Sequence, residues 1–66
     1  MNIILNGEPA TVPDACSVAD LIQAQRLAGQ RLAVELNGAI VVRSRWAEVR
    51  LAENDRAEIV RAVGGG

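Results

Sequence analysis

Apolar and polar residues alternate in short blocks along the chain, and turn-forming residues separate the blocks. Residues 2–5 and 8–12 are strand-like, and Asn6-Gly7 lies between them. Asn-Gly is favoured in two-residue hairpin turns, because both central positions need a positive φ. Pro9 cannot donate a hydrogen bond to a neighbouring strand, so the second strand is expected at a sheet edge. The pattern therefore predicts an N-terminal hairpin that ends at residues 13–14.

The next block has the spacing of a helix. Ser17 is typical of an N-cap, and Asp20, three residues later, is expected to complete a capping box. Gly29 stands where a helix of about ten residues would need a left-handed residue just past its end. We expect one side of this helix to pack on a sheet through the apolar residues Val18, Leu21 and Ile22.

A second hairpin is predicted after the helix. Residues 32–36 alternate between apolar and other side chains at Leu32, Val34 and Leu36, which is the period of a strand buried on one face. Asn37-Gly38 repeats the turn signal, and residues 39–42 are expected to form the returning strand.

The remaining residues predict a helical turn and a last strand. Ser44 is expected to cap a single helical turn that contains Trp46, the only aromatic residue. We interpret Trp46 as a core residue, since a sole large ring usually fills the interior of a small domain. Residues 57–63 are apolar at both alternating positions, which favours either a central strand or a partly exposed apolar patch.

The predicted order is strand, strand, helix, strand, strand, strand, which is an α+β arrangement with one helix layered on one sheet. The chain of 66 residues is short enough to form a single domain over residues 1–66, with residues 63–66 as its C-terminal tail.

The composition restricts the chemistry that the chain can perform alone. Cys16 is the only cysteine and histidine is absent, which excludes multi-cysteine metal sites and a Cys-His nucleophile pair. Cys16 is expected to be a small buried filler, with a thiol of lowered pKa at the helix start as the alternative. We therefore expect no bound cofactor or metal and no enzyme activity of the chain's own.

Charge and hydropathy exclude further classes of protein. The formal charge is −1 and the pI is about 5.2, so the basic patch that nucleic-acid binding needs is lacking. No apolar run approaches the roughly 20 residues of a membrane span, and Met1 to Leu5 do not have the features of a signal peptide. We expect a cytoplasmic protein. All seven cationic side chains are arginines, so no lysine is present to accept an isopeptide bond.

The chain ends in Val63 and three glycines, Gly64, Gly65 and Gly66. Glycine has no Cβ, so such a segment can enter a narrow slot. Four extended residues reach roughly 13 Å, which suits delivery of the terminal carboxylate into another protein's active site. The alternative is that the glycines are frayed and without function.

Several segments together resemble the ubiquitin-like β-grasp fold and, within it, the ThiS family of bacterial sulfur carriers for thiazole synthesis. The segments are Glu35-Leu36-Asn37-Gly38, Ile40-Val41-Val42-Arg43, Ser44 with Trp46, Asp55-Arg56-Ala57-Glu58-Ile59-Val60 and Ala62-Val63-Gly64-Gly65-Gly66. The sequence departs from the family at Val42, Asn54 and Ala57, where proline, glycine and a larger aliphatic residue are common. These positions concern turn geometry and core volume.

The resemblance implies a mixed sheet of about five strands with one main helix on one face and a short helical turn near Trp46. It also implies a two-step activation by partners. An adenylyltransferase similar to ubiquitin-activating enzymes would use ATP to adenylate the Gly66 carboxylate. Sulfur from a cysteine desulfurase or persulfide relay protein would then give a thiocarboxylate, and thiazole synthase would take the sulfur. Gly64 and Gly65 would be the tether, and Val60, Arg61, Ala62 and Val63 would contact partners.

Three other functions stay open at this point. The chain is also similar to the small subunit of molybdopterin synthase, which uses the same terminal chemistry. A ubiquitin-like protein modifier would attach Gly66 to target lysines. A noncovalent interaction module would bind through a sheet edge or patch and would need no terminal glycines.

Overall fold

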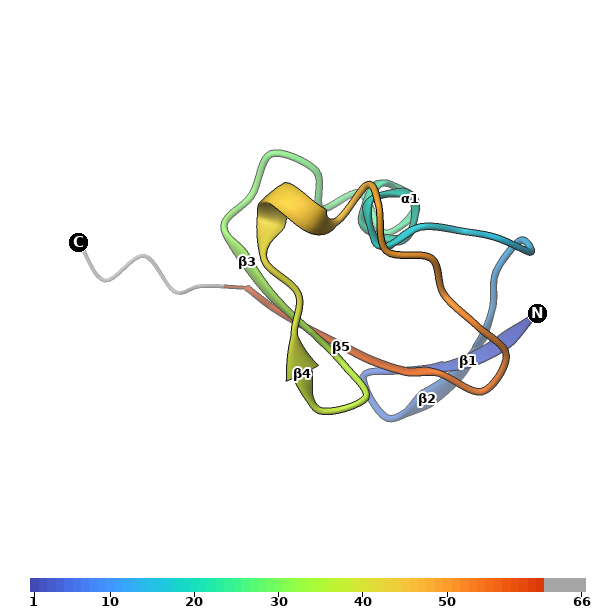
Figure 1. Cartoon of the computed structure of the whole chain (residues 1–66). Coiled ribbons are helices and arrows are strands. Elements are labelled where there is room, and N and C mark those ends of the chain that lie inside the picture. The colour runs from blue at the N-terminus through green and yellow to red at the C-terminus, as the bar shows by residue number, and fades with distance from the viewer. Residues whose placement is uncertain (62–66) are drawn as a thin grey trace.

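A computed structural model describes residues 1–61, and it contains one sheet and one α-helix (Figure 1). The elements in chain order are β1 (Asn2–Leu5), β2 (Glu8–Thr11), α1 (Val18–Ala24), β3 (Leu32–Leu36), β4 (Ala39–Ile40), the 3₁₀ turn η1 (Arg43–Arg45) and β5 (Arg56–Arg61). This is the predicted element order. β2 ends one residue before the predicted boundary, and β4 is two residues shorter than predicted.

The strands lie in the order β2-β1-β5-β3-β4. β1 and β5 are parallel, whereas the other neighbouring pairs are antiparallel, so the sheet is mixed as predicted. β2 is an edge strand, in agreement with Pro9. β5 is the central strand, which confirms one of the two positions predicted for the apolar segment near the C-terminus.

The two hairpin turns have the predicted backbone conformation. Asn6 and Gly7 have φ values of 51° and 82°, and Asn37 and Gly38 have φ values of 53° and 86°. Two successive positive φ values are those of a type I′ turn, whose twist matches the twist of the strands on either side. The Asn-Gly dipeptides therefore fix the register of both hairpins.

The helix begins as predicted but ends early. Ser17 Oγ accepts a hydrogen bond from Asp20 N at 3.0 Å, and Asp20 Oδ2 accepts one from Ser17 N at 3.1 Å, which completes the capping box. The helix ends at Ala24, and Arg26, not Gly29, is the left-handed residue that follows it, with φ 60°. The prediction for Gly29 was wrong, since that glycine has its positive φ in a later turn. No helix within residues 1–61 is long and apolar enough to cross a membrane.

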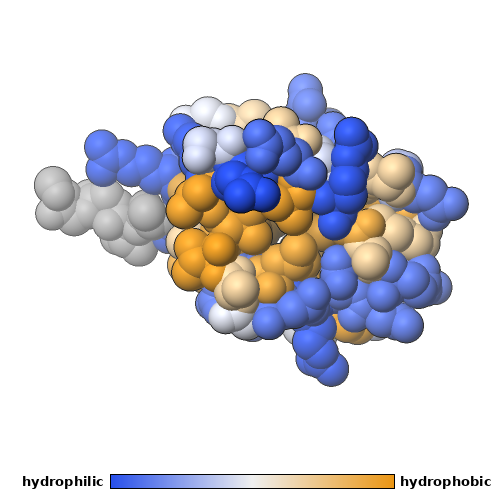
Figure 2. Space-filling model, viewed as in Figure 1, coloured by the Kyte–Doolittle hydropathy of each residue, from blue (hydrophilic) through white to orange (hydrophobic). Residues whose placement is uncertain are grey.

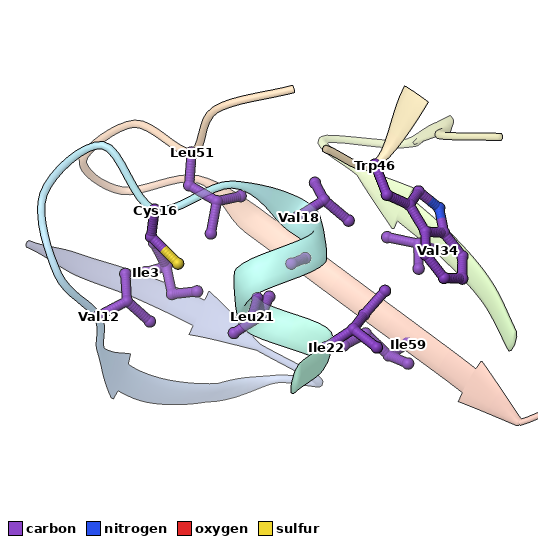
Figure 3. Packing of buried hydrophobic residues seen from close by; sticks show 11 residues of the cluster. Ile3, Val12, Cys16, Val18, Leu21, Ile22, Val34, Trp46, Leu51 and Ile59 are labelled. Atoms are coloured by element: carbon purple, nitrogen blue, oxygen red, sulfur yellow. The ribbon is translucent and has the colours of Figure 1, made fainter. Parts of the chain in front are cut away.

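The hydrophobic core lies between α1 and the sheet (Figure 3). The helix contributes Val18, Leu21 and Ile22, all predicted, and the sheet contributes Ile3, Val34, Ala57 and Ile59. Val12, Cys16, Trp46 and Leu51 complete the core. Trp46 and Cys16 are thus buried, which confirms both as core residues.

The segment around Trp46 differs from the prediction in its cap. Ser44 lies inside η1, and Val42, which precedes the turn, makes no side-chain capping bond. The prediction that Ser44 caps this turn was therefore wrong. Trp46 is held instead by its indole N–H, which donates to Val41 O at 2.8 Å, and by the Arg43 guanidinium, whose Cζ lies 5.2 Å from the ring centroid.

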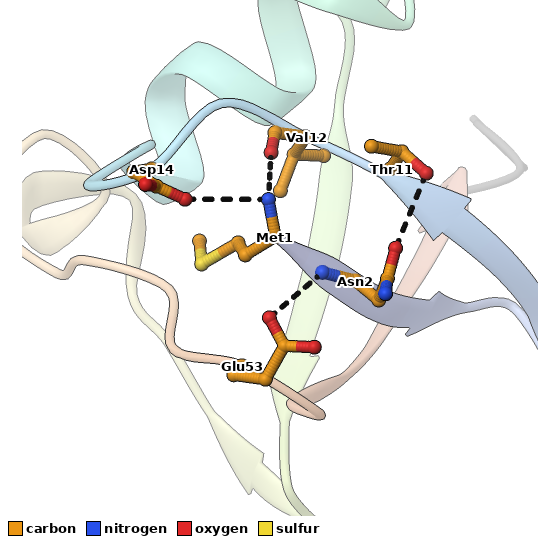
Figure 4. Close-up of polar contacts among 6 residues, drawn as sticks. All are labelled: Met1, Asn2, Thr11, Val12, Asp14 and Glu53. Carbon is orange, nitrogen blue, oxygen red and sulfur yellow. Dashed lines mark hydrogen bonds and ion pairs between the residues drawn. The ribbon is translucent and has the colours of Figure 1, made fainter.

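Polar contacts fasten β1 to the loops around it (Figure 4). The amino group of Met1 donates to Val12 O at 2.7 Å and to Asp14 Oδ1 at 3.3 Å. Asn2 N donates to Glu53 Oε1 at 3.0 Å, which connects β1 with the loop that leads into β5. The start of β1 is therefore held both to the residue that follows β2 and to the loop that precedes β5.

Candidate functional site

The predicted site lies at the C-terminal end of β5 and beyond it. Of its residues, Val60 and Arg61 belong to β5, and both are exposed. Gly66, the tether residues Gly64 and Gly65, and the predicted partner contacts Ala62 and Val63 lie outside the described residues. The structure therefore describes this site through β5, the strand that precedes residues 62–66 in the chain.

Hydrogen bonds on the β1 side hold β5 in place. Ile4 N donates to Asp55 O at 2.8 Å, and Asn6 N donates to Ala57 O at 2.9 Å. Beyond the end of β1, the side chain of Asn6 takes over, because its Oδ1 accepts a hydrogen bond from Ile59 N at 2.8 Å. Asn6 thus extends the pairing of β5 toward its C-terminal half.

Asn37 has a similar role on the β3 side. Its Oδ1 accepts from Arg56 N at 2.9 Å, and its backbone N–H donates to Arg56 O at 2.7 Å. Its Nδ2 also donates to Asp55 Oδ1 at 3.0 Å, and Asp55 Oδ2 accepts from Ala52 N at 2.7 Å. The sequence predicted both asparagines only as turn residues, and their contacts with β5 were missed.

The face of the sheet opposite α1 carries exposed apolar side chains. Ala57 and Ile59 of β5 point into the core, so Val60 points to the other face, where it pairs with Ala33 of β3. Val60 is 57% exposed, Ile40 of β4 is 64% exposed and Val42 is 56% exposed. Figure 2 shows hydrophobic surface over β4 and the segment that follows it. Ile40 and Val42 line a hollow together with Val49, and the sequence did not single out these exposed residues.

Two carboxylates lie on the same outer face. Glu35 of β3 pairs in register with Glu58 of β5, and Glu35 also pairs with Ile40 of β4. Within residues 1–61, neither carboxylate takes part in an ion pair. The sequence could not identify this pair, because two residues 23 positions apart become neighbours only through the strand register.

A hollow of about 200 Å³ lies beside these carboxylates. Its lining includes Glu35, Glu58, Arg56 and the two hairpin turns at Gly7 and Gly38. Arg56 lies two residues before Glu58 on the same face of β5. The outer face thus has a polar part near the hairpin turns and an apolar part, around Val60, nearer the C-terminal end of β5.

Two ionisable groups near the start of α1 have shifted pKa values. Burial raises the pKa of the Cys16 thiol, and the nearby Asp20 carboxylate raises it further, so the alternative of a lowered thiol pKa was wrong. Hydrogen bonds from Ser17 lower the pKa of the Asp20 carboxyl. No group of three potential metal ligands occurs among residues 1–61.

A mixed five-stranded sheet, with β1 and β5 parallel at its centre and one helix across one face, is the ubiquitin-like β-grasp fold. The model of the ThiS family matches residues 3–66, and the chain belongs to this family. The crystal structure of the thiamine biosynthesis protein ThiS from Geobacter metallireducens has a TM-score of 0.83 and 33% sequence identity, and all of both chains is covered.

Curated relatives agree with this assignment. The sulfur carrier protein ThiS of Bacillus subtilis is 38% identical over 53 residues, which is 80% of each chain. A thiazole synthase of Magnetococcus marinus is 38% identical over 66 residues, and one of Paramagnetospirillum magneticum is 33% identical over the same length. These 66 residues are the whole of this chain but only 20% of each thiazole synthase. The chain therefore spans about a fifth of these two relatives.

Proposed function

We propose that the chain is a sulfur carrier for thiazole formation in thiamine biosynthesis and that Gly66 carries the sulfur as a thiocarboxylate. The observation that carries the proposal is membership of the ThiS family together with three glycines that follow the central strand at a distance of only two residues. The sulfur carrier of Bacillus subtilis and the thiamine biosynthesis protein of Geobacter metallireducens support the same function.

The chemistry begins with activation of the carboxylate. An α-carboxylate has a pKa of about 3.5, so at neutral pH it is ionised and is a poor electrophile. An adenylyltransferase partner would join a carboxylate oxygen to the α-phosphorus of ATP, and pyrophosphate would leave. The product is a mixed anhydride with AMP as a good leaving group.

Sulfur then replaces AMP. The terminal sulfur of a protein persulfide, supplied by a cysteine desulfurase or a relay protein, would attack the acyl carbon and expel AMP. A second thiol would reduce the resulting acyl disulfide, which leaves the thiocarboxylate on Gly66 and a disulfide on the partner. Thiazole synthase would take the sulfur from this thiocarboxylate, and the similarity to two thiazole synthases supports that partner.

The chain itself serves as a carrier and co-substrate, not as an enzyme. Its contribution is positioning, because a central strand that is hydrogen-bonded on both sides fixes the point from which the last residues extend. Val60 and Arg61 are the last two described residues before the tail in the sequence, and we propose them, with Ala62 and Val63, as partner contacts. Since activation consumes ATP, we place the reaction in the cytoplasm.

The test is the intact mass of the protein after incubation with the adenylyltransferase of its organism, ATP and a persulfide source. We expect a mass gain equal to the replacement of one oxygen by sulfur. The control is the chain without Gly66, which should fold, since the contacts described above lie within residues 1–61, but should gain no mass. Absence of both the thiocarboxylate and the adenylate, with partners that are active on another carrier, would contradict the proposal.

A further inference from the structure

The chain has only two strong nucleophiles, the Met1 amino group and the Cys16 thiol. An acyl adenylate on Gly66 would react with any amine or thiolate that reached it. All seven cationic side chains are arginines, and a guanidinium does not lose its proton in proteins, so it has no free electron pair with which to attack. Hydroxyl groups are weak nucleophiles unless a general base activates them. The places of Met1 and Cys16 in the fold therefore decide whether the activated chain can acylate itself.

Both nucleophiles are held by the fold. The Met1 amino group donates to Val12 O at 2.7 Å and forms an ion pair with Asp14 Oδ1 at 3.3 Å (Figure 4). Cys16 is buried, and its thiol donates to Ser17 O at 3.4 Å. Burial also raises the pKa of this thiol, which lowers the fraction of the reactive thiolate at neutral pH.

The parallel pairing of β1 and β5 keeps the Met1 amino group away from the C-terminus. Ile4 pairs with Arg56, Met1 lies three residues before Ile4, and Arg61 lies five residues after Arg56. At about 3.3 Å for each residue, Met1 and Arg61 are roughly 26 Å apart along the strands. Residues 62–66 can span at most roughly 18 Å. Figure 1 shows the N-terminus and the end of β5 on opposite sides of the molecule, so the activated end cannot reach the amino group of its own chain.

The cations near the end of β5 are arginines. Arg61 pairs with Leu32, and the exposed residue Arg31 comes directly before Leu32. Arg43 reaches the same loop, because its Nη2 donates to Gln30 O at 2.7 Å. A lysine at any of these three positions would place an amine where the activated C-terminus can reach it. Arginine supplies the same charge without a nucleophile.

We propose that the fold makes the carrier chemically inert toward its own activated terminus, so that sulfur from a partner reacts with the acyl group without competition from the chain. The inference rests on the proposed function, because it assumes that Gly66 is adenylated. In the reaction that is avoided, an amine would attack the acyl carbon, AMP would leave and the nitrogen would lose a proton to water. The product would be a stable amide, and the carrier would be lost to further cycles.

The test is the variant Arg31→Lys, which keeps the charge but adds an amine near the end of β5. The protein is incubated with the adenylyltransferase and ATP, and no persulfide is added. We expect a product that is lighter by one water in intact mass, with an amide between Gly66 and the introduced lysine. At about 10 µM protein this amide should form roughly a hundredfold faster than links between two copies, because a short flexible segment gives an effective concentration near 1 mM. Its rate should rise from about pH 7 to pH 9, since only a deprotonated amine attacks.

The matched control is Arg50→Lys. It makes the same change in composition at the Met1 side of the molecule, where the Arg50 guanidinium donates to Ala15 O at 2.8 Å, next to Asp14. This variant should form no internal amide. The wild-type chain should also form none, and its adenylate should return to the free carboxylate with unchanged mass.

The outcomes separate this inference from the proposed function, because ATP–pyrophosphate exchange reports adenylation independently of any amide. If Arg31→Lys is adenylated but forms no amide, the inference is overturned while the proposed function stands. Loss of one water from the adenylated wild-type chain would overturn it as well, since the Met1 amino group would then be within reach. If the wild-type chain is never adenylated, both the inference and the proposed function fail.

Discussion

Asn6 Oδ1 accepts a hydrogen bond of 2.8 Å from the backbone N–H of Ile59, a residue 53 positions later in the chain. One side chain of a hairpin turn thereby continues the hydrogen bonding of the central strand after β1 has ended. The same residue has a φ of 51°, which its hairpin turn requires. Asn6 therefore links a local turn to the strand from which the last residues of the chain extend.

Replacement of Asn6 by alanine should reduce stability. The change leaves the Ile59 N–H without its acceptor and places alanine at a positive φ, so the free energy of unfolding should fall by about 2–4 kcal/mol. Urea denaturation measures the loss. Asn6→Asp is the matched control, because it keeps an acceptor oxygen and should be closer to the wild type. Equal stability of Asn6→Ala and the wild type would contradict this role.

Stability should fall at alkaline pH through the ionisation of Cys16. Burial raises the pKa of the folded-state thiol above its ordinary value, so the folded protein holds this proton more tightly than the unfolded chain does. The stabilisation is complete below the ordinary thiol pKa and is lost as the pH rises through the folded-state pKa. The chain contains no lysine and no tyrosine, so Cys16 is its only side chain that titrates in this range.

The measurement is urea denaturation at a series of pH values from neutral to about pH 11, a range that brackets the ordinary thiol pKa. Cys16→Ala is the control, because it removes the titrating group and should lack the alkaline decrease. A decrease of the same size in both proteins would assign it to another group.

Loss of the helix cap should be visible in the same assay. Ser17→Ala removes the oxygen that accepts from Asp20 N, and N-cap replacements of this kind cost about 1 kcal/mol. Ser17→Thr, which keeps a capping hydroxyl without adding a charge at this buried position, serves as the comparison. A Ser17→Ala protein as stable as Ser17→Thr would mean that the cap does not contribute.

Ala15 offers a substitution that should increase stability. Its φ is 62°, a left-handed conformation that costs a residue with a Cβ about 1 kcal/mol. Ala15→Gly should therefore raise the free energy of unfolding, though by less than this amount because glycine makes the unfolded chain more flexible. Ala10→Gly, placed in the strand β2, should have the opposite sign. A loss of stability in Ala15→Gly would contradict the argument.

Local sequence signals predicted those features of the fold that depend on neighbouring residues. Asn37-Gly38 specified its turn, and Ser17 with Asp20 specified the helix start, because the atoms that interact lie within a few positions of one another. The helix end was missed, since Arg26 adopts the left-handed conformation that the sequence pattern assigned to Gly29. Glycine is the usual residue in that conformation, but it is not the only one that can adopt it.

Features that depend on strand register were not predicted. The Glu35–Glu58 pair and the exposure of Ile40 follow from which strands are neighbours and how they align. A shift of one residue would move every side chain of a strand to the opposite face. The terminal glycines, by contrast, were recognised from the sequence alone, and their role remains a prediction because they lie outside the described residues.

The double variant Gly65→Ala/Gly66→Ala tests whether the terminal glycines act in the chemistry. Two added Cβ atoms would hinder entry into a covered active site, and misplacement of a reacting group by about 1 Å can cost a hundredfold in rate. We expect thiocarboxylate formation to fall by about that factor, measured by intact mass over time. Thermal unfolding should be unchanged, because the two replaced glycines lie well beyond Ile59, the last of the core residues described above.

Gly29→Ala is the matched control for that experiment. Gly29 has a φ of 83°, so alanine there should lower stability. A Cβ at this position would meet no atom within 4 Å, so packing around it should not change. Thiocarboxylate formation should therefore stay at the wild-type rate as long as the protein is folded.

Full sulfur transfer by the double variant would show that the glycines are dispensable. The noncovalent interaction module, which needs no terminal glycine, would then be the better description of the chain.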